Sequence, residues 1–292
     1  MAKYILSAFA DEASPALDEQ IRALTEAGVC CVELRGVGGK SVKDLTLDEA
    51  KAVRAKLDAA GIRVSSMGSP FGKIGIEDDF EPHFAEFRHA LELCGILGTK
   101  LMRVFSFYIP AGKDPAAYRP EVLRRMTAML DAADAAGVRL AHENEKGIYG
   151  DIGDRCLDLR EALGDRLGVI FDPANFIQCG DVPAQQFPKL QKYITYMHIK
   201  DALLTDGSVV PCGAGDGTVA QILDALSGED MYLSVEPHLT VFKGLENLQG
   251  EALKHKYTYP DSFTAFQAAV SALKDALKSI GFAEGGNGTW IR

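Results

Sequence analysis

Between residues 139 and 236 the chain carries four apolar runs, which read RLAHE (139–143), GVIFD (168–172), ITYMH (194–198) and MYLSVE (231–236). Each run has the length of a β-strand and ends on a residue with an ionisable side chain, and a stretch of helical periodicity follows it. Repeated β-then-α units predict a parallel sheet, in which the carboxyl ends of the strands lie on one face. We therefore expect the four terminal residues to meet in space.

The same pattern extends through the first half of the chain. We predict eight strands, at 3–9, 30–35, 63–67, 100–105, 139–143, 168–172, 194–198 and 231–236. We predict eight helices, at 15–27, 47–60, 80–97, 116–136, 155–163, 183–192, 219–226 and 262–280. Eight β-then-α units close a (β/α)8 TIM barrel, for which about 250 residues are typical. The prediction is an α/β protein with one barrel domain spanning residues 1–292.

Several helix boundaries carry their own signals. Three predicted helices end at an Ala-Gly pair, where glycine allows the backbone to turn into the next strand: Gly28, Gly61 and Gly137. Two predicted helices begin with a capping side chain followed by proline: Ser14-Pro15 and Asp114-Pro115.

The composition argues against several classes of function. The 292 residues are 47% hydrophobic and 25% charged, with a formal net charge of −10. An acidic protein repels phosphate backbones and anionic lipids, so we expect neither nucleic acid nor a membrane as a partner. No apolar run reaches the roughly 20 residues that span a bilayer, and the N-terminal apolar stretch is too short for a signal peptide. Six cysteines without a CxxC pair indicate reduced thiols, and we expect a cytoplasmic protein.

The four strand-end residues form a candidate metal site. Their side chains offer three carboxylates and one imidazole, from Glu143, Asp172, His198 and Glu236. This donor set suits one hard divalent ion, for which we expect manganese, with cobalt, magnesium or zinc as alternatives. An acidic residue at a strand end can also simply cap the next helix, but four such residues on successive strands favour a metal site.

Other polar residues near strand ends are candidates for binding substrate. They are Asn175, Lys200, Asp201, His238, Arg103 and Glu33. Arg103 and Glu33 serve equally well in a structural salt bridge, and His238 as an ordinary loop histidine. The glycine cluster PCGAGDG (211–217) is a weak candidate for a phosphate cradle, and the long segment 238–261 is typical of a lid or substrate wall.

Strand alternation predicts which side chains share a face. If Glu143 points into the barrel, His142 and Asn144 point toward the helices, while His198 and Lys200 lie on one face. We expect one barrel mouth to gather the four candidate ligands together with Lys200.

At these residues the chain resembles the xylose isomerase-like TIM barrel superfamily, the sugar phosphate isomerase/epimerase group. The resemblance covers essentially the whole chain, and its motifs are HEN (142–144), FDPAN (171–175), MHIKD (197–201), PCGAGDG (211–217) and VEP (235–237). In ketose 3-epimerases of this group the matching Glu, Asp, His and Glu bind one divalent metal. The resemblance also implies that Glu143 and Glu236 are catalytic and exchange protons with the substrate carbon.

The resemblance implies a metal-dependent isomerase or epimerase that acts on a keto sugar or sugar phosphate through an enediolate. The chain departs from the epimerases at Asn175, where they usually carry histidine, and the stretch after His198 lacks their arginine. A lyase or dehydratase acting on a keto-polyol or 3-keto-glycoside is therefore an alternative, and a non-catalytic sugar-binding barrel is a third. The superfamily also has a DNA-cleaving nuclease branch, and membership of it would imply extra histidines in the first half of the chain. Residues 1–137 contain only His83 and His89, which argues against this branch. The expected partners are a small sugar or polyol and a second copy of the chain in a homo-oligomer.

Overall fold

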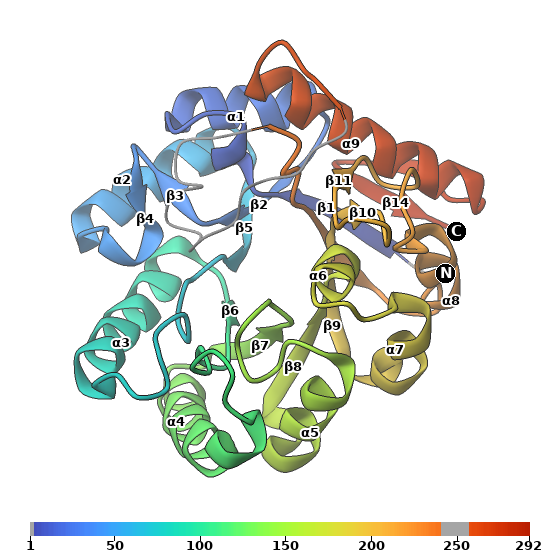
Figure 1. Cartoon of the computed structure of the whole chain (residues 1–292). Helices are drawn as coiled ribbons and strands as arrows, with labels where there is room; N and C mark the ends of the chain where they lie inside the picture. The colour runs from blue at the N-terminus through green and yellow to red at the C-terminus, as the bar shows by residue number, and fades with distance from the viewer. Residues whose placement is uncertain (1–2, 241–256) are drawn as a thin grey trace.

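Eight parallel strands form the centre of the molecule in the computed structural model, which describes residues 3–240 and 257–292 (Figure 1). The strands follow the order β12-β9-β8-β7-β6-β5-β2-β1, and β12 also pairs with β1, which closes the barrel. Their bounds are β1 (Lys3–Ala8), β2 (Cys31–Leu34), β5 (Arg63–Met67), β6 (Leu101–Val104), β7 (Arg139–Glu143), β8 (Leu167–Phe171), β9 (Ile194–Ile199) and β12 (Met231–Val235). The predicted (β/α)8 barrel is confirmed.

The predicted helices surround the barrel as an outer ring (Figure 1). They are α1 (Leu17–Glu26), α2 (Leu47–Ala59), α3 (Phe80–Leu97), α4 (Pro115–Ala135), α5 (Gly153–Leu163), α7 (Pro183–Leu190), α8 (Val219–Ala225) and α9 (Ser262–Ser279). Each predicted strand and helix ends within two residues of the observed bounds. Within residues 3–240 and 257–292, none of the helices combines the length and apolar character needed to cross a membrane.

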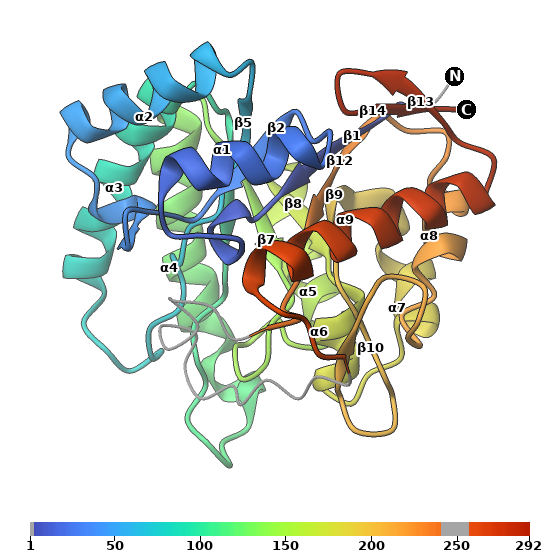
Figure 2. The same ribbon diagram turned by 90° about the horizontal axis from the view of Figure 1, so that it is seen from above.

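Several short elements were not predicted. They are α6 (Pro173–Gln178), the ribbons β3 (Gly36–Val37) with β4 (Lys40–Ser41) and β10 (Asp201–Ala202) with β11 (Val209–Val210), the hairpin β13 (Ala283–Gly286) with β14 (Thr289–Ile291), and the 3-10 turns η1 (Ala10–Glu12), η2 (Val42–Asp44), η3 (Gly164–Arg166) and η4 (Gln191–Tyr193). Strand β14 pairs antiparallel with β1. Figure 2 shows this hairpin and both termini at one end of the barrel, with β10 toward the other.

Most of the predicted helix boundaries are confirmed. Gly28, Gly61 and Gly137 have positive φ values of 65°, 69° and 69°, which glycine adopts without strain. Asp114 caps α4 by accepting a hydrogen bond from the Ala116 N–H at 3.0 Å. The predicted start at Ser14-Pro15 is wrong, because η1 and the turn after it occupy this stretch and α1 begins at Leu17 without a side-chain cap.

A small apolar cluster lies beneath the barrel mouth. It contains the buried residues Ala141, Ile170 and Tyr196, on β7, β8 and β9. Each lies two residues before a polar residue at or next to the carboxyl end of its strand, so both residues face the same side of the strand. The cluster therefore forms a solid floor under the polar strand ends, and the barrel interior is packed rather than open.

Candidate metal centre

The structure brings the four predicted ligands together. Glu143 ends β7, Asp172 directly follows β8, His198 lies in β9, and Glu236 directly follows β12. All four side chains are buried, and one potential ligand atom from each lies within 4.8 Å of the other three. Three carboxylates and one imidazole at this spacing could hold a single divalent ion.

His198 is held with one ring nitrogen facing the cluster. Its Nδ1 lies 2.9 Å from Glu143 Oε1, whereas its Nε2 lies 3.2 Å from Glu33 Oε2 on the other side. Burial works to lower the pKa of His198, but the carboxylates of Glu143 and Glu33 raise it to about 10. A carboxylate on the outer nitrogen is the usual support of a histidine that binds metal through its inner nitrogen.

Asp172 divides its two carboxylate oxygens between a helix and the cluster. Its Oδ1 accepts a hydrogen bond from the Asn175 N–H at 2.9 Å, which caps α6, while Oδ2 makes no hydrogen bond and lies 3.1 Å from Lys200 Nζ. The Asn144 side chain holds the Asp172 backbone, accepting from its N–H and donating to its C=O. Burial raises the pKa of Asp172 to about 7. A divalent ion could share this buried carboxylate oxygen with the Lys200 ammonium group.

Each glutamate offers one oxygen to the cluster and the other to an arginine. Glu143 Oε2 accepts from Arg103 Nη1 at 3.1 Å, and Glu236 Oε1 accepts from Arg35 Nη1 at 3.1 Å. Burial works to raise both pKa values, yet His198 and Arg103 lower that of Glu143 to about 2. Lys200 and other nearby cations hold the pKa of Glu236 well below its usual range. Both glutamates are therefore ionised at neutral pH.

Lys200 places a positive charge among the ligands. Its Nζ donates to Glu236 Oε2 at 2.8 Å and lies 3.1 Å from Asp172 Oδ2. Burial works against the charged form, but these carboxylates raise the pKa of Lys200 well above its ordinary value. A metal ion at this centre would bind the carboxylates of Asp172 and Glu236, which the ammonium group also contacts. The predicted gathering of Lys200 with the four residues is confirmed.

Three of the predicted substrate-binding residues lie against the ligands. Asn175 Nδ2 donates to Glu143 Oε1 at 3.1 Å, and Arg103, which is buried, holds the other oxygen of that glutamate. Glu33 is also buried, and its oxygens contact the Tyr196 hydroxyl and His198. Glu33 and Arg103 therefore each contact one of the candidate ligands, His198 and Glu143 respectively.

The Asp201 carboxylate is bound within its own loop, and its contact with substrate stays a prediction. Its carboxylate accepts hydrogen bonds from the N–H groups of Gly213, Gly215 and Gly217 at 2.8 to 3.2 Å. The prediction of a phosphate cradle in the same glycine cluster is wrong, because the amides that would bind the anion already bind this carboxylate. The chain turns away after β9, which directs the side chain into its own loop.

Arg35 and Glu12 were missed by sequence reasoning. Arg35 follows β2 and contacts Asp11, Glu12 and Glu236, with its guanidinium 4.6 Å from the centre of the Phe9 ring. Burial raises the pKa of Glu12 to about 8. Arg35 is the last residue of the predicted strand 30–35, and the predicted ligands also lie at strand ends. This position could have identified Arg35 as a candidate site residue from the sequence.

His238 lies beside Glu236, as predicted. Its backbone N–H donates to Glu12 Oε2 at 2.7 Å, and its Nε2 lies 3.6 Å from Glu236 Oε1. Burial holds the pKa of His238 well below its usual value, so the ring is neutral at neutral pH. Of the predicted lid at 238–261, residues 241–256 lie outside the described part of the chain.

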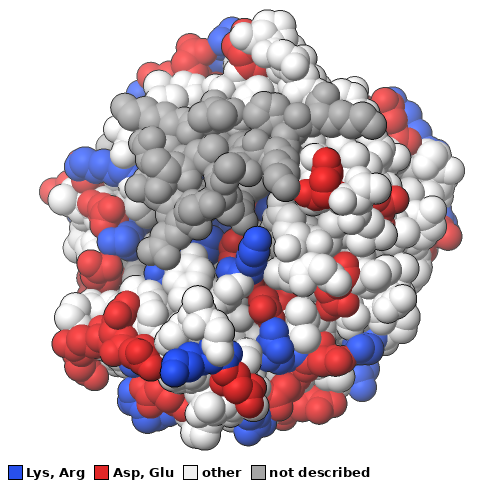
Figure 3. Space-filling model, viewed as in Figure 1, with Lys and Arg blue, Asp and Glu red and all other residues white. Residues whose placement is uncertain are grey.

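The face around the mouth mixes both signs of charge. Figure 3 shows Lys and Arg interspersed with Asp and Glu over the visible described residues of this face. At the rim, Lys73 Nζ pairs with Glu145 Oε2 at 2.7 Å. His142 points away from the barrel, as alternation predicted, with Nε2 at 2.9 Å from Ser106 Oγ.

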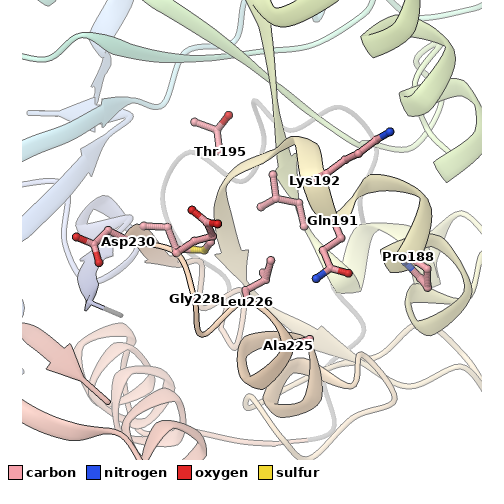
Figure 4. Close-up of a pocket in the computed structure, with 11 residues that line it drawn as sticks. Pro188, Gln191, Lys192, Thr195, Ala225, Leu226, Gly228 and Asp230 are labelled. Carbon is pink, nitrogen blue, oxygen red and sulfur yellow. The ribbon is translucent and has the colours of Figure 1, made fainter. Parts of the chain in front are cut away.

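A cavity of about 480 Å³ lies at the opposite end of the barrel (Figure 4). Gln191, Thr195 and Asp230 help to line it, where β9 and β12 begin. None of the four candidate ligands lines this cavity. Because barrel enzymes place their chemistry at the carboxyl ends of the strands, the cavity is no rival to the metal centre.

Solved structures of known proteins share this barrel. IolI protein with a bound zinc atom is 18% identical, with a TM-score of 0.72 over 95% of this chain and 99% of that chain. L-ribulose 3-epimerase is 17% identical, with a TM-score of 0.70 over 96% of each chain. The probable 3-DHS dehydratase AsbF from Bacillus anthracis is 15% identical, with a TM-score of 0.70 over 94% of this chain and 99% of that chain. At these identities the likeness shows the fold alone.

No curated protein sequence matches the chain. A family model described as xylose isomerase-like TIM barrel matches residues 21–255, which is more than half of the chain. The chain therefore belongs to the xylose isomerase-like TIM barrel family.

Proposed function

We propose that this protein is a divalent-metal-dependent isomerase or epimerase that acts on a keto sugar or sugar phosphate. The observation that carries the proposal is the buried set of Glu143, Asp172, His198 and Glu236 at the carboxyl ends of four neighbouring strands. The fold of an L-ribulose 3-epimerase supports the same reaction class. The family supports a small sugar or polyol as the partner.

The donor set fits a hard or borderline ion, with manganese as the first choice and cobalt, magnesium or zinc as alternatives. His198 Nδ1 and Asp172 Oδ2 face the cluster, while the opposite atoms of both side chains are engaged by Glu33 and by the Asn175 N–H. When bound, the ion would supply Lewis acidity, which stabilises negative charge on the oxygens of a substrate carbonyl and the adjacent hydroxyl.

The two glutamates would move the proton. Glu236 would remove it from the carbon beside the carbonyl, giving an enediolate, and Glu143 would return a proton from the other face. Their strands, β12 and β7, are separated by β8 and β9, so the two carboxylates approach from different sides of the cluster. Each glutamate has one oxygen held by an arginine, Arg35 or Arg103, which fixes its orientation but lowers its basicity. Substrate binding would have to loosen these contacts before proton transfer.

A lyase or dehydratase using the same centre is the second candidate. Lys200 Nζ lies 2.8 Å from Glu236 Oε2, so a proton donor stands beside the proposed base. If a hydroxyl on the next carbon accepted that proton and left as water, the same enediolate would lead to dehydration. The fold of the dehydratase AsbF fits this outcome equally well.

A calorimetric titration of Mn²⁺ into chelator-stripped protein tests the metal site. We expect one site in the wild type and at least about tenfold weaker binding in Glu236→Gln, because an anionic ligand becomes neutral. The matched control is Glu145→Gln at the rim, which should bind like the wild type. Absence of binding in the wild type, or equal affinity in all three proteins, would contradict the proposed ligands.

The reaction class is tested by incubating the metal-loaded enzyme with keto sugars in D₂O. Exchange at the carbon beside the carbonyl, with epimer formation, supports the isomerase, whereas loss of water supports the lyase. Metal and sugar binding without exchange or turnover would show a non-catalytic sugar-binding barrel and refute both enzyme proposals. Glu236→Gln should abolish exchange while keeping the wild-type circular dichroism spectrum.

A further inference from the structure

Two adjacent cysteines lie at the end of the barrel opposite the metal centre. Cys31 is the first residue of β2 and is fully buried, while Cys30 before it is partly exposed. Their Sγ atoms are 3.6 Å apart, so the two thiols face each other although they come from neighbouring residues. The proposed reaction has no use for either thiol.

A cation lies against this pair. Arg63 begins the neighbouring strand β5, and its Nη2 donates to Cys30 Sγ at 3.6 Å. The hydrogen bond between the two thiols, with Arg63 opposing the effect of burial, lowers the pKa of Cys30 to about 6. A lowered pKa increases the share of the thiolate, which is the reactive form of cysteine, at neutral pH.

The C-terminal hairpin packs directly on Cys30. Gly288, in the turn between β13 and β14, lies so close that a Cβ at this position would stand 2.9 Å from Cys30 Sγ. Its carbonyl accepts a hydrogen bond from the Leu6 N–H, which ties the turn to β1. The thiol pair is therefore held between a strand, a cation and the hairpin.

We propose that Cys30 and Cys31 form an oxidation-sensitive dithiol that reacts with hydroperoxides. The Cys30 thiolate attacks the peroxide O–O bond, which leaves Cys30 as a sulfenic acid and releases an alcohol or water. Cys31 then attacks the sulfenyl sulfur, so that an S–S bond forms, the S–O bond breaks, and water carries away the thiol proton and the hydroxyl group. The cysteines lose two electrons in total, and the hydroperoxide accepts them.

Geometry predicts that the resulting disulfide is easily reduced. Consecutive Cα atoms are about 3.8 Å apart, which is shorter than the roughly 4.4 Å lower limit of common disulfides. A strained disulfide has a higher reduction potential, so dithiothreitol should restore both thiols rapidly. The site therefore behaves as a reversible modification and not as a structural crosslink.

Mass spectrometry of the reduced full-length protein after limiting hydrogen peroxide tests the proposal. We expect the wild type to lose the mass of two hydrogen atoms within the peptide holding both cysteines, and to regain it with dithiothreitol. In Cys31→Ser the sulfenic acid has no partner, so dimedone should label Cys30. Cys212, partly exposed but beside Asp201, is the internal control, because burial and this carboxylate raise the pKa of its thiol.

Arg63→Gln should slow oxidation of Cys30 by about tenfold, since it removes the cation that favours the thiolate. Arg139→Gln is the matched control, because Arg139 also begins a strand and is exposed. The proposal is overturned if Cys30 in the wild type oxidises no faster than Cys212. It is equally overturned if dimedone labels wild-type Cys30 and no disulfide forms.

Discussion

Replacing Lys200 with methionine removes a lysine ammonium that contacts two of the proposed ligands. In the structure Lys200 Nζ lies 2.8 Å from Glu236 Oε2 and 3.1 Å from Asp172 Oδ2, and all three side chains are buried. Without the cation, two buried carboxylates in the metal-free protein lose a direct partner. A divalent ion would supply the missing charge. The variant should therefore be unstable when stripped of metal and recover when metal is bound.

The size of the effect follows from the two contacts. At an effective dielectric constant of about 20, opposite unit charges 3 Å apart attract by about 5 kcal/mol before desolvation is counted. Removing one partner of a buried ion pair typically costs about 3–5 kcal/mol. We expect Lys200→Met to lower the free energy of unfolding by that amount in chelator and by less than about 2 kcal/mol with saturating Mn²⁺. Because a competing cation is gone, Mn²⁺ should also bind at least about tenfold more tightly.

Urea denaturation followed by circular dichroism, in EDTA and in Mn²⁺, measures both effects. Lys73→Met is the control, because the Lys73–Glu145 pair lies at the rim outside the four-residue cluster. Its small loss should be the same in both buffers. If Lys200→Met loses equal stability with and without Mn²⁺, or binds Mn²⁺ more weakly than the wild type, the placement of the metal among these carboxylates is refuted.

Three further outcomes are expected. Glu33→Gln should weaken Mn²⁺ binding by about 10–100-fold without removing a ligand, because Glu33 orients His198; unchanged affinity by calorimetry would contradict this. His83 accepts a hydrogen bond from the Gly72 N–H, and burial lowers the pKa of its ring to about 4. On acidification the ring therefore becomes protonated at a higher pH in the unfolded chain than in the folded protein. The free energy of unfolding should fall as the pH drops from about 6.5 to 4. In His83→Gln this part of the acid denaturation curve should flatten; an unchanged curve would exclude His83 as its cause. Gly72→Ala would place a Cβ 2.1 Å from the Phe105 carbonyl oxygen at a φ of +93°. In urea denaturation it should lower the free energy of unfolding by at least about 2 kcal/mol. Gly112→Ala is the control and should lose less, because Gly112 also has a positive φ but open space around it.

The barrel and the centre of the site were predictable because both follow from the strand pattern. In a parallel barrel the strand ends meet on one face, so the positions of Glu143, Asp172 and His198 imply their proximity without any knowledge of the loops. Side-chain alternation also placed His142 outside. These inferences depend on periodicity alone, which a single sequence displays fully.

The contacts that the sequence did not predict lie beyond the ends of the strands, where periodicity no longer applies. Asp201 stands just beyond β9, and its direction depends on a loop that returns 12 residues later to enclose it. The Arg35 contacts with Asp11 and Glu236 join three separate loops, which no local pattern reveals. The β13–β14 hairpin did carry a local signal, because Asn287-Gly288 is a typical two-residue turn and both residues have positive φ.

The hydrogen bonds between Asp201 and the glycine amides make the loop after β9 a natural site for redesign. They fix the base of the loop, while its tip, residues 203–208, includes Leu204, which is 47% exposed. Insertions or randomised residues at the tip should leave Asp201, and with it the strand that carries His198, in place. A library that varies this tip and retains Asp201 and its three glycines would alter the loop that follows β9 without disturbing the centre. Substrate range could then be selected independently of metal binding.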